Sequence, residues 1–310
     1  MEIWILLPLF SALLMAIVNV VDKFFVLEGE DKLNFKSFCL YSGGMQIIIC
    51  IVMFLLDPFS IDINLISHEI FFLLMSGVCY GISLIFLVKG MELEEISRVE
   101  PVYLIHTIIV PIFALFLLEE SLTFFQYLGI SLIFGSSLFA SIRWTKNLSM
   151  INSSAILSLL LGAVFISIGN VLLKYSVDRL SFSYTQILSV RAMGLFFGAG
   201  LPFFRKAYLN ELTRFFKHKK RGLILFVAET LFPLLSMFMI VVALTKLDIS
   251  VVNAFNGVRP IFTVFLSTLL ALIIKKSSES IDLPNIFFNA LFLTSLEPPL
   301  AQIVQSTDID

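Results

Sequence analysis

Apolar runs long enough to cross a bilayer recur along almost the whole chain, and they restrict its fold more than any other feature. A spanning helix needs about 20 mostly apolar residues to cross about 30 Å of hydrocarbon. The runs are continuously apolar rather than alternating, which favours helices over a β-barrel. The predicted spans are Ile3–Val21, Ser37–Leu56, Ile70–Val88, Val99–Leu118, Leu122–Ile142, Ser154–Leu173, Ser183–Phe204, Leu223–Leu244 and Val251–Ile274.

The composition agrees with a membrane protein, because 58% of the residues are hydrophobic and only 14% are charged. A soluble domain is typically about 45–50% apolar and about 25% charged. The net charge of −2 argues against a nucleic-acid partner. The first apolar run has no positively charged start, so we interpret it as a span rather than a signal peptide.

The last segment, residues 277–310, is atypical. Pro284–Val304 is a doubtful tenth span, because its apolar part is about half the length that a span needs before Glu297 and two prolines end it. Two interpretations stay open. The segment is either a short, broken last helix or a C-terminal sequence altered by truncation or frameshift.

The two halves of the chain share three short patterns in the same order. Each half has an asparagine in the last third of a span with a lysine four residues later, at Asn19 and at Asn170. An Ile-Ser pair recurs at residues 96–97 and 249–250, and a Pro-Ile-Phe stretch at Pro111 and Pro260. Five spans per half force the second half to cross in the opposite sense, and such inverted repeats are typical of transporters.

The first half resembles the EamA-type family of the drug/metabolite transporter superfamily. The residues that carry this resemblance are Gly90, Ile96, Ser97, Pro111, Leu118, Glu119, Glu120, Leu122, Thr123, Gln126, Gly129 and Gly135. The resemblance implies an all-helical fold of about ten spans in two inverted five-helix repeats, and secondary transport of small metabolites or drugs. We expect the first repeat at residues 1–147 and helices six to nine at residues 148–276.

Glu229 is the strongest candidate for a functional residue within a span. An ionisable side chain in hydrocarbon usually faces a cavity or a partner. Glu229 is therefore a candidate for lining a substrate cavity and for carrying a proton. The alternative is that it reaches the interface or pairs with Arg191 or Arg259. His106 is the second candidate for proton coupling, with a hydrogen-bonded structural role as its alternative.

Four asparagines are further candidates for the substrate cavity. Asn19 and Asn170 are mates in the repeat, so they either line a central cavity or lock helices together. Asn253 and Asn256 stand beside Gly257 and a proline, where we expect irregular backbone. Irregular backbone at membrane depth is tolerated where it lines a cavity or is buried in protein.

Four residues are predicted to act structurally. Pro111 and Pro260 each remove a backbone hydrogen bond and kink their helices. Glu120 belongs to a tight turn between spans, where Ser121 is placed to cap the next helix. Arg191 resembles an arginine that many family members carry in this helix, and we expect it to brace a neighbouring helix end.

Lysine and arginine gather in one set of loops, and only Lys174, Arg179 and Lys246 lie in the other. The positive-inside rule then places the N-terminus outside the cytoplasm, whereas the resemblance implies that both termini lie inside. Arg205–Arg221 is the most basic stretch. It fits either an interfacial helix held by anionic lipid or a solvated basic loop.

We therefore predict a multi-pass protein of a prokaryotic cytoplasmic membrane that exports a small-molecule substrate. One alternative is a non-transporting structural or regulatory protein, a decayed paralogue. A weaker one is an enzyme acting on lipid-linked substrates, because the chain lacks the motifs that such chemistry uses. We expect no enzyme activity, catalytic residue, cofactor or metal site. Three scattered cysteines give no disulfide or zinc pattern.

Overall fold

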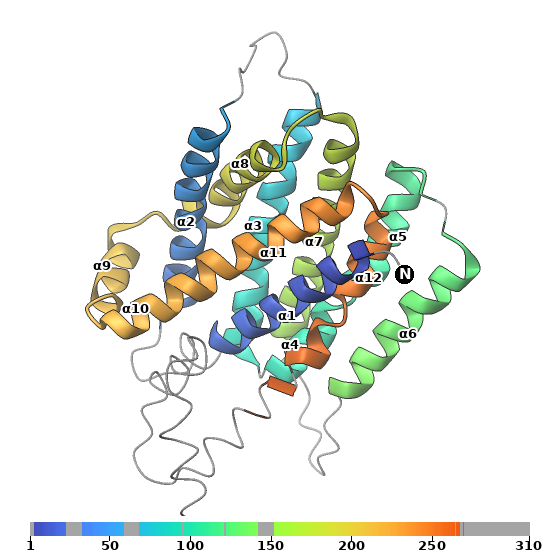
Figure 1. The fold of residues 1–310 in the computed structure, drawn as a ribbon. Coiled ribbons are helices and arrows are strands. Elements are labelled where there is room, and N and C mark those ends of the chain that lie inside the picture. Colours follow the sequence, from blue (N-terminus) through green and yellow to red (C-terminus); the bar gives the residue numbers. More distant parts are fainter. Residues whose placement is uncertain are drawn as a thin grey trace, which may run out of the picture.

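The computed structural model describes residues 3–22, 33–58, 68–94, 96–120, 122–141, 152–263, 265–266 and 269, and every regular element among them is a helix (Figure 1). The first half contains η1 (Ile3–Ile5), α1 (Leu6–Val21), α2 (Phe35–Leu56), α3 (His68–Leu93), α4 (Ile96–Tyr103), α5 (His106–Leu117) and α6 (Phe124–Ser141). The second half contains α7 (Ser153–Arg179), α8 (Tyr184–Leu195), η4 (Phe196–Gly200), η5 (Leu201–Phe203), α9 (Lys206–Phe215), α10 (Lys219–Phe226), η6 (Val227–Leu231), α11 (Phe232–Leu244) and α12 (Ile249–Asn256).

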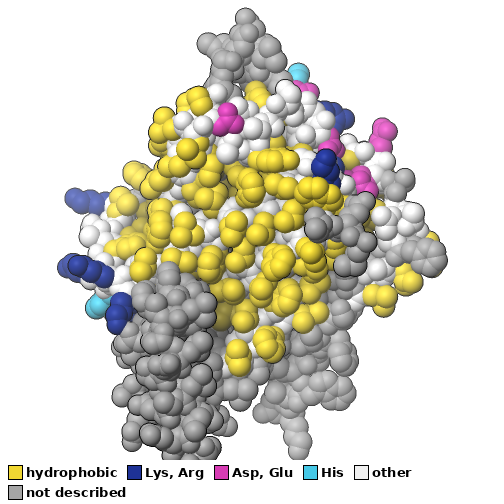
Figure 2. All heavy atoms as spheres, viewed as in Figure 1, with side chains coloured by type: hydrophobic (Ala, Val, Ile, Leu, Met, Phe, Trp, Pro, Cys, Tyr) yellow, Lys and Arg dark blue, Asp and Glu magenta, His cyan; other side chains and the backbone are white. Residues whose placement is uncertain are grey.

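The helical membrane fold predicted from the apolar runs is confirmed. Five helical stretches are long and apolar enough to cross a membrane: 35–56, 68–93, 153–179, 184–203 and 219–244. The shorter helices α1 and α5 are also apolar. Hydrophobic side chains cover the middle of the face in Figure 2, and charged side chains gather toward its edges. The doubtful tenth span and the rest of residues 277–310 lie outside the described residues.

Helix packing follows the repeat. In the first half α3 packs against α7, and its mate in the second half, α11, packs against α1. In the same way α4 contacts α7, and its mate α12 contacts α1 (Figure 1). Each half thus packs its helices against the first helix of the other half, so the two repeats interlock rather than form separate domains.

A seam of glycines brings α3 and the α8–η4 stretch into backbone contact. A Cβ atom at Gly194 would lie 2.1 Å from the carbonyl oxygen of Leu74, and one at Gly77 would lie 2.1 Å from that of Arg191. One turn further, a Cβ atom at Gly198 would lie 2.4 Å from the carbonyl oxygen of Val78. Small residues four apart let membrane helices approach closely and pack by van der Waals contact. This seam fixes the backbone that carries Arg191.

The fourth and ninth spans are interrupted at matching places in the repeat. The helix stops at Tyr103 and restarts at His106, and it stops at Asn256 and restarts at Arg259. The irregular backbone expected beside Gly257 is therefore present. Pro260 contributes to it, because it offers no N–H to the carbonyl of Asn256.

The break in the fourth span was not predicted, because Val99–Leu118 is a continuous apolar run with its only expected kink at Pro111. Near the break, side chains form hydrogen bonds with backbone carbonyls. His106 Nδ1 lies 2.8 Å from the oxygen of Tyr103, and Thr107 Oγ1 donates to that of Leu104 at 2.9 Å. Pro111 lies inside α5, which continues on both sides of it.

Two wide helical turns with π-type hydrogen bonding, η4 and η6, each precede a proline. Pro202 cannot donate to the carbonyl of Gly198, and Pro233 cannot donate to that of Glu229. A π turn accommodates the missing bond, and such turns are frequent at functional sites. Glu229 lies in η6 and is buried.

The basic stretch at residues 205–221 forms helix α9 and the start of α10 rather than a loop. Leu212 and Phe215 are buried against α2. The Glu211 carboxylate accepts hydrogen bonds from Asn34 N at 2.7 Å and Ser37 Oγ at 2.5 Å, at the start of α2. The apolar face of α9 is therefore largely covered by the protein, and lipid binding by its basic residues stays a prediction.

Candidate functional site

A cavity of about 100 Å³ lies between the two halves, lined by α1 to α5 of the first half and by α7, α8, η6, α11 and α12 of the second. The structure places every residue predicted for substrate or proton binding on its wall. These residues are Asn19, His106, Asn170, Glu229, Asn253 and Asn256. Polar groups that lie far apart in the sequence therefore share one enclosed space, as a binding site requires.

Glu229 forms one polar end of the cavity together with Asp22 at the end of α1. Ser42 Oγ donates to Glu229 Oε2 at 2.6 Å. Asp22 is buried on the same cavity wall, and its Oδ1 has no hydrogen-bond partner among the described residues. Among the described residues, Glu229 forms no ion pair with Arg191 or Arg259, the alternative partners that the sequence offered.

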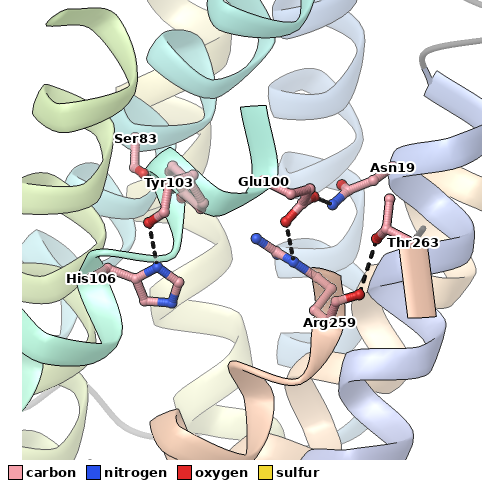
Figure 3. A network of polar contacts seen from close by, with 7 residues as sticks. All are labelled: Asn19, Ser83, Glu100, Tyr103, His106, Arg259 and Thr263. Carbon is pink, nitrogen blue, oxygen red and sulfur yellow. Dashed lines mark hydrogen bonds and ion pairs between the residues drawn. The ribbon is translucent and has the colours of Figure 1, made fainter. Parts of the chain in front are cut away.

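A second polar group joins the two halves at Glu100 (Figure 3). Asn19 Nδ2 donates to Glu100 Oε1, and Arg259 Nε lies 3.2 Å from Glu100 Oε2. Thr263 Oγ1 donates to the carbonyl of Arg259 at 3.1 Å. Asn19 therefore both lines the cavity and ties α1 to α4, so the two roles expected for it coexist.

His106 belongs to a hydrogen-bonded group with Tyr103 and Ser83 (Figure 3). Because a carbonyl oxygen only accepts, His106 Nδ1 carries the hydrogen in its 2.8 Å contact with Tyr103 O. Ser83 Oγ donates to the carbonyl of Gly162 at 2.7 Å, so Tyr103 Oη donates to Ser83 Oγ at 2.7 Å. These bonds fix the ring of His106 at the break of the fourth span.

The asparagines of the ninth span line the cavity, and each has one unsatisfied buried atom. Asn253 Nδ2 and Asn256 Oδ1 are buried without a hydrogen-bond partner among the described residues. Asn170, the repeat mate of Asn19, also lines the cavity. A buried amide without a partner is costly, so these groups are suited to meet a ligand or water.

Arg191 lies in the cavity wall, although the sequence suggested only a structural role for it. Its side chain is buried, and its guanidinium carbon lies 5.1 Å from the centre of the Tyr80 ring. Its Nε has no hydrogen-bond partner among the described residues.

The remaining residues predicted to be structural, Pro111, Pro260 and Glu120, are not among those lining the cavity. The Glu120 carboxylate accepts from Ile249 N at 3.0 Å and from Ser250 Oγ at 2.9 Å. It therefore caps the start of α12 in the other half. Ser121 lies outside the described residues, and Thr123 exchanges hydrogen bonds with Gln126 where α6 begins.

Sequence reasoning missed several residues of the site. Asp22 and Glu100 stand at the edges of apolar runs, where charged residues are usually taken as boundaries. Ser42, Gln46 and Tyr80 also line the cavity, but they have no distinctive spacing. Within the described part of the chain, no three His, Cys, Asp or Glu side chains come together as a metal site, and the three cysteines are free thiols.

Comparisons with known proteins agree with the fold. Residues 2–142 match the EamA-like transporter family. A search of curated proteins gives no match. Among solved structures, one crystal structure of a protein aligns with a TM-score of 0.59 and 12% sequence identity, covering 92% of this chain and 94% of that chain. At this identity the likeness shows the fold alone, and it extends over both halves.

Proposed function

We propose, from its EamA-like first half, that this protein is a secondary transporter that moves a small organic solute across a prokaryotic cytoplasmic membrane by alternating access. The observation that carries the proposal is the cavity between the two repeats, whose wall brings together polar side chains of both halves. In transporters built from repeats, the substrate site lies near the midplane at the repeat interface, formed by interrupted helices. Here both interrupted spans contribute to the cavity wall.

Rocking of one half against the other exposes the cavity to each side in turn. The helix pairs α3 with α7 and α1 with α11 place helices of both halves side by side around the cavity. Export is the direction we propose.

The coupling ion in this proposal is a proton held by Asp22 and Glu229. Both acids are buried and line the cavity, and ionisation of both would place two negative charges on its wall. Charge of this kind favours a conformation that opens the site to water. His106 is the weaker candidate, because its Nδ1 hydrogen is committed to a backbone carbonyl.

The test is growth of a sensitive bacterial host that expresses the full chain, across toxic amino-acid analogues, lipophilic cations and nucleoside analogues. We expect resistance to one class, and loss of that resistance in Glu229→Gln and Asp22→Asn. Glu211→Gln is the matched control, because Glu211 lies on α9 outside the cavity. Membrane insertion of each variant is checked by immunoblotting.

Proteoliposomes then separate transport from proton coupling. With purified protein, substrate flux should depend on an imposed pH gradient in the wild type and become independent of it in Glu229→Gln. Flux that responds to the gradient equally in both proteins would remove the acid pair from the mechanism. No flux and no resistance for any compound, with insertion normal, would count against transport itself.

A further inference from the structure

Two buried arginines line the cavity, and among the described residues only one of them has a counter-ion. Arg259 is 7% exposed and Arg191 is 3% exposed. Arg259 has a fixed counter-ion, with its Nε 3.2 Å from Glu100. Arg191 forms no ion pair within the described residues, and its Nε is buried without a hydrogen bond. Burying an unpaired charge is costly, so the position needs an explanation beyond packing.

No acid among the described residues forms an ion pair with Arg191. Glu100 binds Asn19 and Arg259. Glu229 accepts a hydrogen bond from Ser42, and Asp22 Oδ1 is buried without a hydrogen-bond partner among the described residues. The guanidinium of Arg191 instead lies over the face of the Tyr80 ring, which attracts it but contributes no negative charge.

The backbone of Arg191 is held rigidly, as a binding residue requires. Its carbonyl packs directly on Gly77, and Gly194 one turn later packs on the carbonyl of Leu74. Both contacts leave no room for a side chain, so α8 and α3 are in direct backbone contact at this level. The seam positions the backbone of Arg191, and its guanidinium lies over the Tyr80 ring at the cavity wall without an ion pair to any acid of the described residues.

We propose that Arg191 binds the anionic group of the transported solute, a carboxylate or a phosphate. The guanidinium donates in a planar fork that matches either group, and such charge-assisted bonds are stronger than neutral ones. The unsatisfied amides of Asn253 and Asn256 offer one donor and one acceptor for the rest of the ligand. This inference rests on the proposed function, since it names the chemical class of that transporter's substrate.

The test is thermal unfolding of the purified full-length chain in detergent with four probes of similar shape. Benzoate and phenyl phosphate are anions, benzamide is neutral and benzylammonium is a cation. We expect one or both anions to raise the Tm of the wild type, and the two anions separate a carboxylate site from a phosphate site. Arg191→Gln should weaken anion binding by at least roughly tenfold, the loss expected for a charge-assisted bond. Arg191→Lys should retain part of it, because lysine keeps the charge but not the fork.

Ligand-free stability provides a second readout. An arginine that braces a helix end would lower the Tm when replaced, whereas an unpaired charge kept for a ligand would leave the Tm of Arg191→Gln equal to or above that of the wild type. Arg205→Gln is the matched control, since Arg205 precedes α9 and does not line the cavity. The anion response of Arg205→Gln should equal that of the wild type.

The inference is overturned if neither anion raises the Tm, if benzamide acts as strongly as the anions, or if Arg191→Gln still responds. These outcomes are separate from failure of transport, because they are measured on the purified protein without a gradient. Transport of cations with no anion response would keep the proposed function and remove this inference.

Discussion

Arg259 of the second half and Glu100 of the first form an ion pair in the interior, with Arg259 Nε 3.2 Å from Glu100 Oε2 and side-chain exposures of 8% and 1%. Asn19 occupies the other carboxylate oxygen, so three helical segments meet at one acid. Arg259 lines the cavity, and its pairing with Glu100 joins the two repeats. Its loss should therefore affect both stability and the relative position of the halves.

Replacing Glu100 with glutamine should destabilise the protein strongly. It leaves Arg259 buried without a counter-ion, and breaking a buried pair in this way costs about 3–5 kcal/mol. Exchanging both residues, as Glu100→Gln with Arg259→Met, should recover much of the loss, because no charge then remains unpaired. Unfolding in detergent micelles of the single and double variants measures the coupling.

Lys174 and Asp178 supply the control for this pair. They form an ion pair at 2.8 Å on α7, but the Asp178 side chain is 43% exposed. Asp178→Asn should cost no more than about 1 kcal/mol. If Glu100→Gln and Asp178→Asn lowered the stability equally, burial would not strengthen the contribution of the Glu100–Arg259 pair.

The glycine seam predicts that Gly194→Ala is poorly tolerated. The new Cβ would lie 2.1 Å from the carbonyl oxygen of Leu74, and a backbone atom cannot turn aside as a flexible side chain does. Overpacking of this kind costs roughly 1–3 kcal/mol or more. Gly44→Ala on α2 is the control, since a Cβ there would meet no neighbouring group within 4 Å, and alanine favours the helix. Thermal unfolding should separate the two variants clearly, and equal Tm values would contradict close contact at the seam.

Glu120 of the first half caps α12 of the second, and replacing it should lower the stability by a smaller amount. Glu120→Ala removes the acceptor for Ile249 N and Ser250 Oγ, so the start of α12 should fray. The expected loss is about 1–2 kcal/mol. Glu119→Asn is the control, because Glu119 is exposed and has a φ of 58°, which asparagine tolerates. Hydrogen exchange of the α12 amides should rise in Glu120→Ala alone.

Sequence alone predicted the helical repeat, because apolar length and the recurring Asn, Ile-Ser and Pro patterns depend only on residues near each other in the chain. It also predicted that Glu229 and Asn253 matter, since polar groups within apolar runs need an explanation. The break before His106 was missed, because it depends on side chains that bind carbonyls one turn away. The pairing of Glu100 with Arg259 was missed as well, because it joins residues that only the folded repeats bring together.

Asp57, which follows the last turn of α2, predicts a stability change in acid. Its carboxylate accepts hydrogen bonds from Ser183 Oγ, from Thr185 Oγ1 at 2.7 Å and from Gln186 Nε2 at 3.2 Å, all at the start of α8. These bonds, chiefly the one from Ser183, lower the pKa of Asp57 below its ordinary value of 3.8.

The sign of the effect follows from linkage. A carboxyl whose pKa is lower in the folded state contributes stability above its unfolded pKa and loses it as the pH falls through the folded value. Wild type should therefore exceed Asp57→Asn in Tm at neutral pH, and the difference should shrink as the pH falls from about 5 to below 3.8. Melting curves of the two proteins across this range measure it, with Asp178→Asn as a control at an exposed acid. A difference that stays constant down to the lowest pH would mean that the charge of Asp57 does not hold α2 to α8.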